Sequence, residues 1–250
     1  MGGGEHGLVL RQAQHEAFPA AAPERLILSL SKDEARARTP WISAGNFGYM
    51  RGMTIEPVTL ENAFVRLEPL EERHREPLRE TGNDPDLWRF ANVNLDNSNF
   101  DAWVDHRFTE MKRAGEMTYA VFDKASGSYA GSTSLLAYVP AHKRVEIGWT
   151  WYAKRVWAGA VNPSCKRLLL AHGFEVLGLN RMELKADARN QRSRLAMERF
   201  GATFEGVHRA HMVRPDGRLR DTAWFSVIRE EWPRVRDGLD ARLAGFSASA

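Results

Sequence analysis

Residues 145–163 combine features that favour the binding of an anion. Residues 145–152 are aromatic and β-branched, the composition of a strand, and residues 153–161 form a loop of small residues around Gly159. Asn162 is a good N-cap, and Pro163 fits the first helical position, where its missing N–H costs nothing. Unpaired N–H groups at a helix start attract negative charge, and Gly159 would let a phosphate approach the backbone. The stretch predicts a phosphate site, although an ordinary strand-to-helix turn has the same composition.

The same stretch resembles the acyl-CoA signature of the GNAT superfamily of N-acetyltransferases. Val156-x-x-Gly159-x-Val161, preceded by Glu146-Ile147-Gly148-Trp149, stands where the family has Gln/Arg-x-x-Gly-x-Gly/Ala, so it departs at the first and last positions. Within the superfamily, the chain is similar to the RimJ/RimL-like branch, which acetylates the N-termini of ribosomal proteins. The Asn-Gln-Arg-Ser stretch at 190–193 and the Arg-Pro-Asp-Gly-Arg turn at 214–218 also carry this resemblance.

The resemblance implies an acyltransferase that uses acetyl-CoA as its co-substrate and needs no metal. The loop backbone would hold the pyrophosphate, and a backbone N–H near Trp151 would hold the acetyl carbonyl. Asn190 is implied to bond the pantetheine arm and Ser193 to protonate the leaving thiolate, with Tyr152 as another candidate hydroxyl. Without the resemblance, Asn190 is simply the N-cap of a short helix. The cofactor-binding residues expected are Trp151, Val156, Trp157, Ala158, Gly159, Ala160, Val161, Asn162 and Asn190.

Acetyl transfer to an amine needs a neutral amine, a hydrogen-bond donor to the thioester carbonyl and a proton for the leaving thiolate. Glu146, next to the signature loop, is the candidate base, although a strand-end glutamate can also simply pair with an arginine. Deprotonation at pH 7 costs roughly 1 kcal/mol for an α-amine and about 4.6 kcal/mol for a lysine. This difference favours an α-amine, such as a protein N-terminus, or a similarly acidic amine. We expect the amine to attack the thioester directly in a ternary complex.

Several other side chains are candidates for the phosphates or the acceptor pocket, and each also has an ordinary structural explanation. Cations that could meet the CoA phosphates are Lys154, Arg155, Arg192 and Arg194. The acceptor pocket is expected to draw on Trp88, Phe90, Phe100, Trp103 and the 206–220 hairpin, with Asp84 and Asp86 placed to attract a cation. Core packing is the default role of such aromatic residues.

The elements that must position these residues follow in a clear order. Strands are expected at 63–70, 118–122, 129–137, 145–152, 181–186, 203–213 and 219–227, and helices at 71–81, 100–114, 162–177, 190–200 and 233–243. Antiparallel strands broken by two βα steps predict an α/β fold with helices on both faces of the sheet. The resemblance makes this a GNAT-type mixed, mostly antiparallel central sheet. Its fourth and fifth strands, 145–152 and 181–186, would splay apart to admit acyl-CoA.

The first 52 residues do not have the pattern of a folded domain. Gly2 to Gly4 open the chain, and residues 19–23 are alanine and proline only, so residues 1–52 are predicted to be a disordered tail. Met50 and Met53 lie just before the fold, and we hypothesise that native translation starts at one of them. N-terminal sequencing that finds the Gly2 end in natively expressed protein would refute this. Residues 53–250 are expected to form a single acetyltransferase domain with a C-terminal helix.

Composition narrows the functional class. The 250 residues are 43% hydrophobic and 27% charged, with a net charge of +3 and interleaved signs, which does not favour nucleic-acid binding. No apolar run is long enough to cross a membrane. Cys165 is the only cysteine, which suits the cytoplasm and a packed rather than reactive role. His208-x-x-His211 lacks companions for a zinc site. We expect a monomer or homodimer.

Three other functions fit parts of the pattern. The acceptor could be a small-molecule amine such as an aminoglycoside, a polyamine or an amino acid. The chain could instead be a non-catalytic acyl-CoA-binding regulator, which would bind CoA but release no free thiol when amines are added. A nucleotide-binding module is disfavoured because the Gly-Lys-Ser/Thr of a phosphate loop is missing.

Overall fold

The computed structural model describes residues 55–91 and 98–247. The predicted tail, 1–52, and the hypothesis about Met50 and Met53 lie outside the described residues. The strands are β1 (Leu60–Glu61), β2 (Val65–Pro69), β3 (Met117–Asp123), β4 (Ser128–Val139), β5 (Arg144–Tyr152), β6 (Arg181–Asp187), β7 (Thr203–Val213) and β8 (Leu219–Ile228). The α-helices are α1 (Arg75–Gly82), α2 (Phe100–Ala114), α3 (Val161–Ala171), α4 (Gln191–Arg199) and α5 (Trp232–Ser247).

The strands form one sheet in the order β1-β2-β3-β4-β5-β6-β8-β7. Every neighbouring pair is antiparallel except β5 and β6, which run parallel and are joined through α3. A parallel pair needs such a crossover, because a tight turn can join only antiparallel strands. The predicted mixed, mostly antiparallel sheet is confirmed, and the predicted fourth and fifth strands are β5 and β6.

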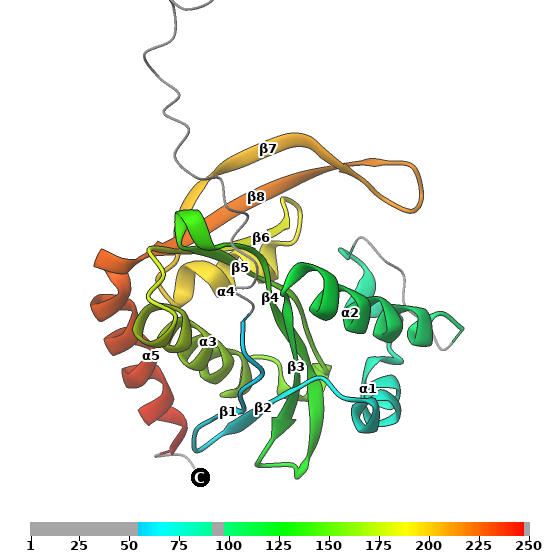
Figure 1. The fold of residues 1–250 in the computed structure, drawn as a ribbon, viewed down its shortest axis with the longest axis horizontal. Helices are drawn as coiled ribbons and strands as arrows, with labels where there is room; N and C mark the ends of the chain where they lie inside the picture. Colours follow the sequence, from blue (N-terminus) through cyan, green and yellow to red (C-terminus); the bar gives the residue numbers. More distant parts are fainter. Residues whose placement is uncertain (1–54, 92–97, 248–250) are drawn as a thin grey trace, which may run out of the picture. The chain divides into compact units, whose positions relative to one another are not determined.

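Helices cover both faces of this sheet (Figure 1). On one face, Leu169 and Leu170 of α3 and Leu239 of α5 share a core with Val145 and Met182 of the sheet. On the other face, a smaller core gathers residues of α1, α2, β3 and β5 and of the segments that follow β2 and α1: Leu70, Leu78, Trp88, Phe100, Trp103, Val104, Ala120 and Trp151. The β7–β8 hairpin extends past the sheet toward the side of α2 (Figure 1). Strand β5 therefore contributes side chains to two separate cores.

An irregularity in β5 explains this double contribution. Gly148 faces Ser134 of β4 and Trp151 faces Ser132, so β5 has one more residue than β4 over this interval, and Trp149 adopts a left-handed φ of 48°. A bulge of one residue reverses the alternation of side chains along a strand. Before it, Val145 and Ile147 face α3; after it, Tyr152 faces α3.

Two further contacts of β5 define a gap. Its pairing with β6 ends at Glu146, which is opposite Glu183, so the rest of each strand diverges from the other. On its other side, β5 lies tightly against Gly131 of β4, where a Cβ atom would overlap the carbonyl oxygen of Trp151. The expected splaying of these two strands is therefore observed.

Candidate active site

The loop between β5 and α3 presents a cluster of backbone N–H groups without protein acceptors. Its first part folds as a 3-10 turn, Lys154–Val156, and the N–H of Gly159 donates to the carbonyl oxygen of Val156 at 3.3 Å. Within the described residues, four N–H groups at the start of α3 have no acceptor: those of Ala158, Ala160, Val161 and Asn162. Such groups, at the positive end of a helix, are suited to bind a phosphate.

The capping prediction for this helix is wrong. α3 begins at Val161 with Ala160 as its N-cap, so Asn162 is already the second helical residue, and no side chain caps the helix. Pro163 lies third, still inside the first turn, where a missing N–H has no intrahelical partner to lose. An uncapped start leaves the N–H groups of the first turn open to a ligand.

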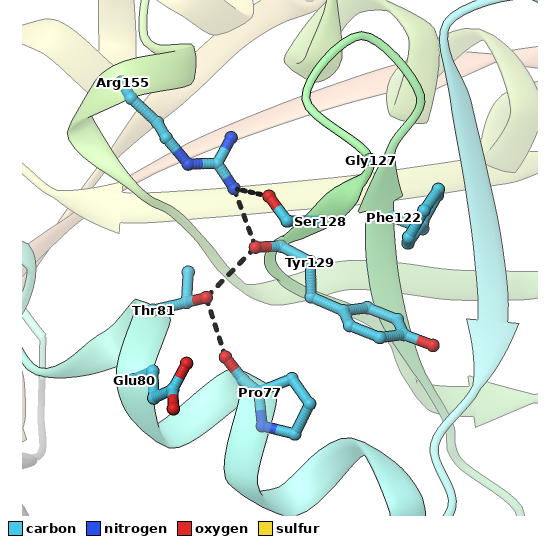
Figure 2. Close-up of a pocket in the computed structure, with 8 residues that line it drawn as sticks. All are labelled: Pro77, Glu80, Thr81, Phe122, Gly127, Ser128, Tyr129 and Arg155. Carbon is cyan, nitrogen blue, oxygen red and sulfur yellow. Dashed lines mark hydrogen bonds between the residues drawn. The ribbon is translucent and has the colours of Figure 1, made fainter.

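Two of the four cations predicted for the phosphates are held by carboxylates. Lys154 Nζ lies 3.0 Å from Asp84 and 2.6 Å from Asp86, so these aspartates neutralise the loop rather than stand free. Arg155 pairs with Asp123 at 3.2 Å. It also donates to the Ser128 hydroxyl and the Tyr129 carbonyl of β4, at 2.9 and 2.8 Å (Figure 2). Both side chains anchor the loop to the sheet and to the segment after α1.

The cavity beside Arg155 is separate from the gap between β5 and β6. It measures about 480 Å³ and lies between α1 and the β3–β4 turn, with Thr81 bridging to the Tyr129 carbonyl (Figure 2). Of the residues predicted for the site, only Arg155 lines it.

Of the four cations predicted for the phosphates, Arg192 is the one that packs on the loop without a carboxylate partner among the described residues. Its guanidinium carbon lies 3.3 Å from the centre of the Trp157 ring, and it forms no ion pair with a described residue. Burial lowers the pKa of Arg192. Arg194 instead donates to the carbonyl of Ala188 at 3.2 Å. Arg192 therefore brings to the loop with the open N–H groups a positive charge that no described carboxylate neutralises.

Glu146 occupies the point where β5 and β6 separate. Its side chain is buried, and its Oε2 lies 2.8 Å from Lys185 Nζ. Burial raises the pKa of Glu146, and the Lys185 ammonium opposes that effect. A buried carboxylate with a raised pKa, next to one lysine, has the properties of a general base near neutral pH.

Glu146 faces the side of the sheet opposite α3, because Val145 and Ile147 on either side of it face α3. On that side, β6, β7 and β8 form a depression of about 400 Å³, lined by Arg181, Glu183, Glu205, Gly206, Val207, His208 and Trp224. Lys185 connects the two places, since its Nζ also lies 5.0 Å from the centre of the Trp224 ring. The depression and Glu146 therefore lie on the same side of the sheet.

Asn190 caps α4, as predicted. Its Oδ1 accepts from the N–H of Ser193 at 3.1 Å, and its amide NH2 has no partner among residues 55–91 and 98–247. Trp151 packs against Trp88 and Trp103, and burial raises the pKa of Tyr152 well above its usual value. The roles in catalysis and cofactor binding predicted for Ser193, Asn190 and the loop residues stay predictions.

The aromatic residues considered for the acceptor pocket are mostly core residues. Trp88, Phe100 and Trp103 are buried. His208 and His211 pack on Trp224. Among residues 55–91 and 98–247, no group of three His, Cys, Asp or Glu side chains could hold a metal ion. In the same residues, no helix has both the length and the apolar character needed to span a membrane.

Lys166 is a residue of this region that the sequence analysis missed. It is only 4% exposed, and its Nζ lies 3.4 Å from the Thr150 hydroxyl of β5. Burial lowers its pKa to about 8. One signal could have identified it: Lys166 precedes Leu169 and Leu170 by three and four residues, so it shares their apolar face of the helix.

Comparisons with known proteins concern the fold that carries this site. Residues 65–203 match the family described as acetyltransferase (GNAT) domain. A GCN5-related N-acetyltransferase from Brucella melitensis is 33% identical, with a TM-score of 0.70, over 76% of this chain and 87% of that one. Mycobacterium smegmatis RimJ in complex with CoA-disulfide, at 19% identity and a TM-score of 0.64, shares the fold over 74% of this chain and 95% of that one.

A curated relative, "Putative ribosomal N-acetyltransferase YdaF" of Bacillus subtilis (strain 168), is 32% identical over 106 residues. That match spans 42% of this chain and 57% of the length of the relative. Together the comparisons confirm the resemblance inferred from the loop and its flanks.

Proposed function

This chain belongs to the GNAT acetyltransferase family, and on that premise we propose that it transfers an acetyl group from acetyl-CoA to a primary amine. The proposal depends above all on one observation: β5 and β6 part at Glu146, beside a helix whose first turn has open N–H groups. The amine attacks the thioester directly, within a ternary complex.

The chain offers donors that fit the cofactor. The N–H groups of residues 158 and 160–162 would hold the pyrophosphate, and Arg192 would add a positive charge. The free amide NH2 of Asn190 would donate to the pantetheine arm. Acetyl-CoA supplies the activated acyl group, and the protein supplies orientation and charge.

Glu146 would accept the proton of the attacking amine. We propose a protein N-terminal α-amine as the acceptor, because deprotonating it at pH 7 costs roughly 1 kcal/mol, against about 4.6 kcal/mol for a lysine. A single carboxylate already paired with Lys185 is a sufficient base for the first and a weak one for the second. The name of the Bacillus subtilis relative supports this acceptor class.

The test has two parts. Calorimetric titration with acetyl-CoA should give saturable binding, and its absence would remove the proposal. Release of free CoA thiol is then followed with matched acceptors: a peptide with a free N-terminus, the same peptide acetylated at its N-terminus but carrying a lysine, and small-molecule amines. Thiol release with the first peptide alone supports the α-amine. Release only with the small molecules would overturn that choice and keep the acetyl transfer.

A further inference from the structure

Lys166 is a buried cation with no use in the mechanism above. Its ammonium nitrogen has one polar partner among the described residues, the Thr150 hydroxyl at 3.4 Å, and no carboxylate pairs with it there. The Thr150 hydroxyl also lies 2.7 Å from the Thr133 hydroxyl of β4. A buried ammonium without a counterion is costly, and such groups concentrate at functional sites.

The position of Thr150 links this cation to the gap. Thr150 belongs to the part of β5 beyond its last pairing with β6 at Glu146, and it is exposed while Lys166 beneath it is not. Because the bulge at Trp149 reverses the alternation, Thr150 faces α3 while Glu146 faces the opposite side. The proposed base and the Lys166–Thr150 pair therefore reach the same gap from its two faces.

We propose that the Lys166 ammonium, acting through the Thr150 hydroxyl, supplies the proton to the departing CoA thiolate. The inference rests on the proposed acetyl transfer. The amine nitrogen bonds to the carbonyl carbon, and the carbon–sulfur bond breaks with its electron pair on sulfur. Sulfur takes the Thr150 proton as Thr150 takes one from Lys166. Glu146 takes the proton lost by the amine and releases it to solvent, and solvent returns a proton to Lys166, so the net charge is unchanged.

The energetics suit this transfer. An ordinary thiol has a pKa of about 8–9, and burial lowers the pKa of Lys166 to about 8, so the proton moves almost without cost. The ionisable groups around the ammonium are the Cys165 thiol on the same helix and, against that thiol, the Tyr152 phenol. Burial raises the pKa of Cys165 to about 11, so both groups stay neutral at pH 7. Neither holds the lysine proton in place.

Ser193, the donor implied by the family resemblance, is the competing candidate. It lies in the first turn of α4, where its N–H donates to Asn190. No acidic or cationic side chain bonds to its hydroxyl within the described residues, so nothing there would resupply its proton. Thr150 differs because the Lys166 ammonium, which can resupply its proton, lies 3.4 Å from its hydroxyl.

The first experiment titrates the thiol of bound CoA by its thiolate absorbance, in wild type, Lys166→Met and Thr150→Val. The wild-type protein should hold about tenfold more thiolate at pH 7 than Lys166→Met, because a nearby ammonium lowers a thiol pKa by about one unit. Thr150→Val keeps the ammonium and should hold more thiolate than Lys166→Met. Equal thiol pKa values overturn this inference and leave the acetyl transfer intact. Failure of the wild-type protein to bind CoA overturns both.

The second experiment measures turnover. Lys166→Met and Thr150→Val should lose about a hundredfold in kcat, with the KM for acetyl-CoA little changed, as expected for loss of a general acid. Thr150→Ser should restore most of the rate. Lys166→Arg keeps a charge but cannot release a proton, so it should stay slow. Ser193→Ala is the matched control: a large loss there, with Lys166→Met fully active, overturns the inference.

Discussion

Two buried charges, Glu68 and Lys166, differ in how completely their neighbours compensate them. Glu68 lies on β2 beside α1 and is 4% exposed, the same fraction as Lys166. Its oxygens meet four side chains: Arg66 at 2.6 Å, His74 at 2.9 Å, Tyr129 at 3.0 Å and Arg73 at 3.1 Å. Lys166 meets one hydroxyl at 3.4 Å.

The protonation equilibria follow this difference. Burial alone would raise the pKa of Glu68, but the hydrogen bonds from His74, Arg66 and Tyr129 outweigh it and lower that pKa to about 2. Burial lowers the pKa of Lys166 to about 8, and no neighbour restores it. The fully compensated charge supports the architecture. The uncompensated one costs stability but can exchange a proton near neutral pH.

Glu146 is partly compensated, since it is buried and has one ion-pair partner, Lys185. Its replacement should have the largest effect on activity. Glu146→Gln should lower turnover about a hundredfold or more, because a general base typically contributes this much, and should leave CoA affinity nearly unchanged. Glu183→Gln is the matched control, since Glu183 is paired to Glu146 in register but is held by Arg144 and Arg181. Steady-state kinetics over a range of pH decide it: unchanged turnover of Glu146→Gln at every pH excludes this base.

Replacement of the compensated charge, Glu68, should lower the free energy of unfolding. The pKa of Glu68 falls from 4.5 to about 2 on folding, which corresponds to roughly 3 kcal/mol. Because the folded pKa is the lower one, this stability is present above pH 4.5 and is lost as pH falls through 2. Glu68→Gln should therefore lose about 3 kcal/mol at pH 7 and progressively less below pH 4.5. Urea unfolding measures this, and an equal loss at pH 7 and pH 2.5 would contradict it.

Replacement of the uncompensated charge, Lys166, should increase the free energy of unfolding instead of lowering it. The folded pKa of Lys166, about 8, lies below its unfolded value of 10.5, so the unfolded chain binds more protons between these values. Wild-type stability should rise with pH across that window. Lys166→Met removes the buried charge and should gain on the order of 2 kcal/mol at pH 7, with the pH-dependent rise abolished. A destabilised Lys166→Met protein would show that an unseen partner compensates the lysine.

Replacement of Asn190 should have the smallest effect. Its Oδ1 caps α4 and its NH2 is proposed to hold the cofactor, so the two functions can be tested separately. Asn190→Ala removes the cap and should cost α4 about 1 kcal/mol. Asn190→Asp keeps the oxygen that accepts from Ser193 and should keep that stability. If the amide NH2 holds the cofactor, both variants lose CoA affinity by calorimetry, whereas full affinity in Asn190→Asp would leave Asn190 as a cap only.

Much of the fold could be predicted because side-chain alternation is local. The strands expected at 145–152 and 181–186 correspond to Arg144–Tyr152 and Arg181–Asp187, and the expected gap lies between them. The bulge at Trp149 was missed, since it adds a residue without changing the composition of the strand. Asn162 was misplaced because capping preference does not tell which residue begins a helix, and α3 begins at Val161 after Ala160, an N-cap without a side-chain hydrogen bond.

The site was harder to predict than the fold because it depends on contacts between distant segments. Lys154 and the two aspartates after α1 were assigned to separate ligands, yet they bind one another. By residue type, Lys166 resembles a surface residue beside Arg167, and only its spacing from Leu169 and Leu170 indicates that it lies on the buried face of α3. A single sequence does not show which residues far apart in the chain form ion pairs.

Gly131, a residue of β4, influences the position of β5 beside the gap. β4 has no side chain there because the Trp151 carbonyl occupies the place of a Cβ atom. Any larger residue would displace the half of β5 that forms one wall of the gap. With acyl-CoA bound in this gap as proposed, Gly131→Ala should change the room for the acyl chain, which a comparison of acetyl- and longer acyl-CoA donors would reveal. Relatives with the same contact residues could in this way diverge in donor preference.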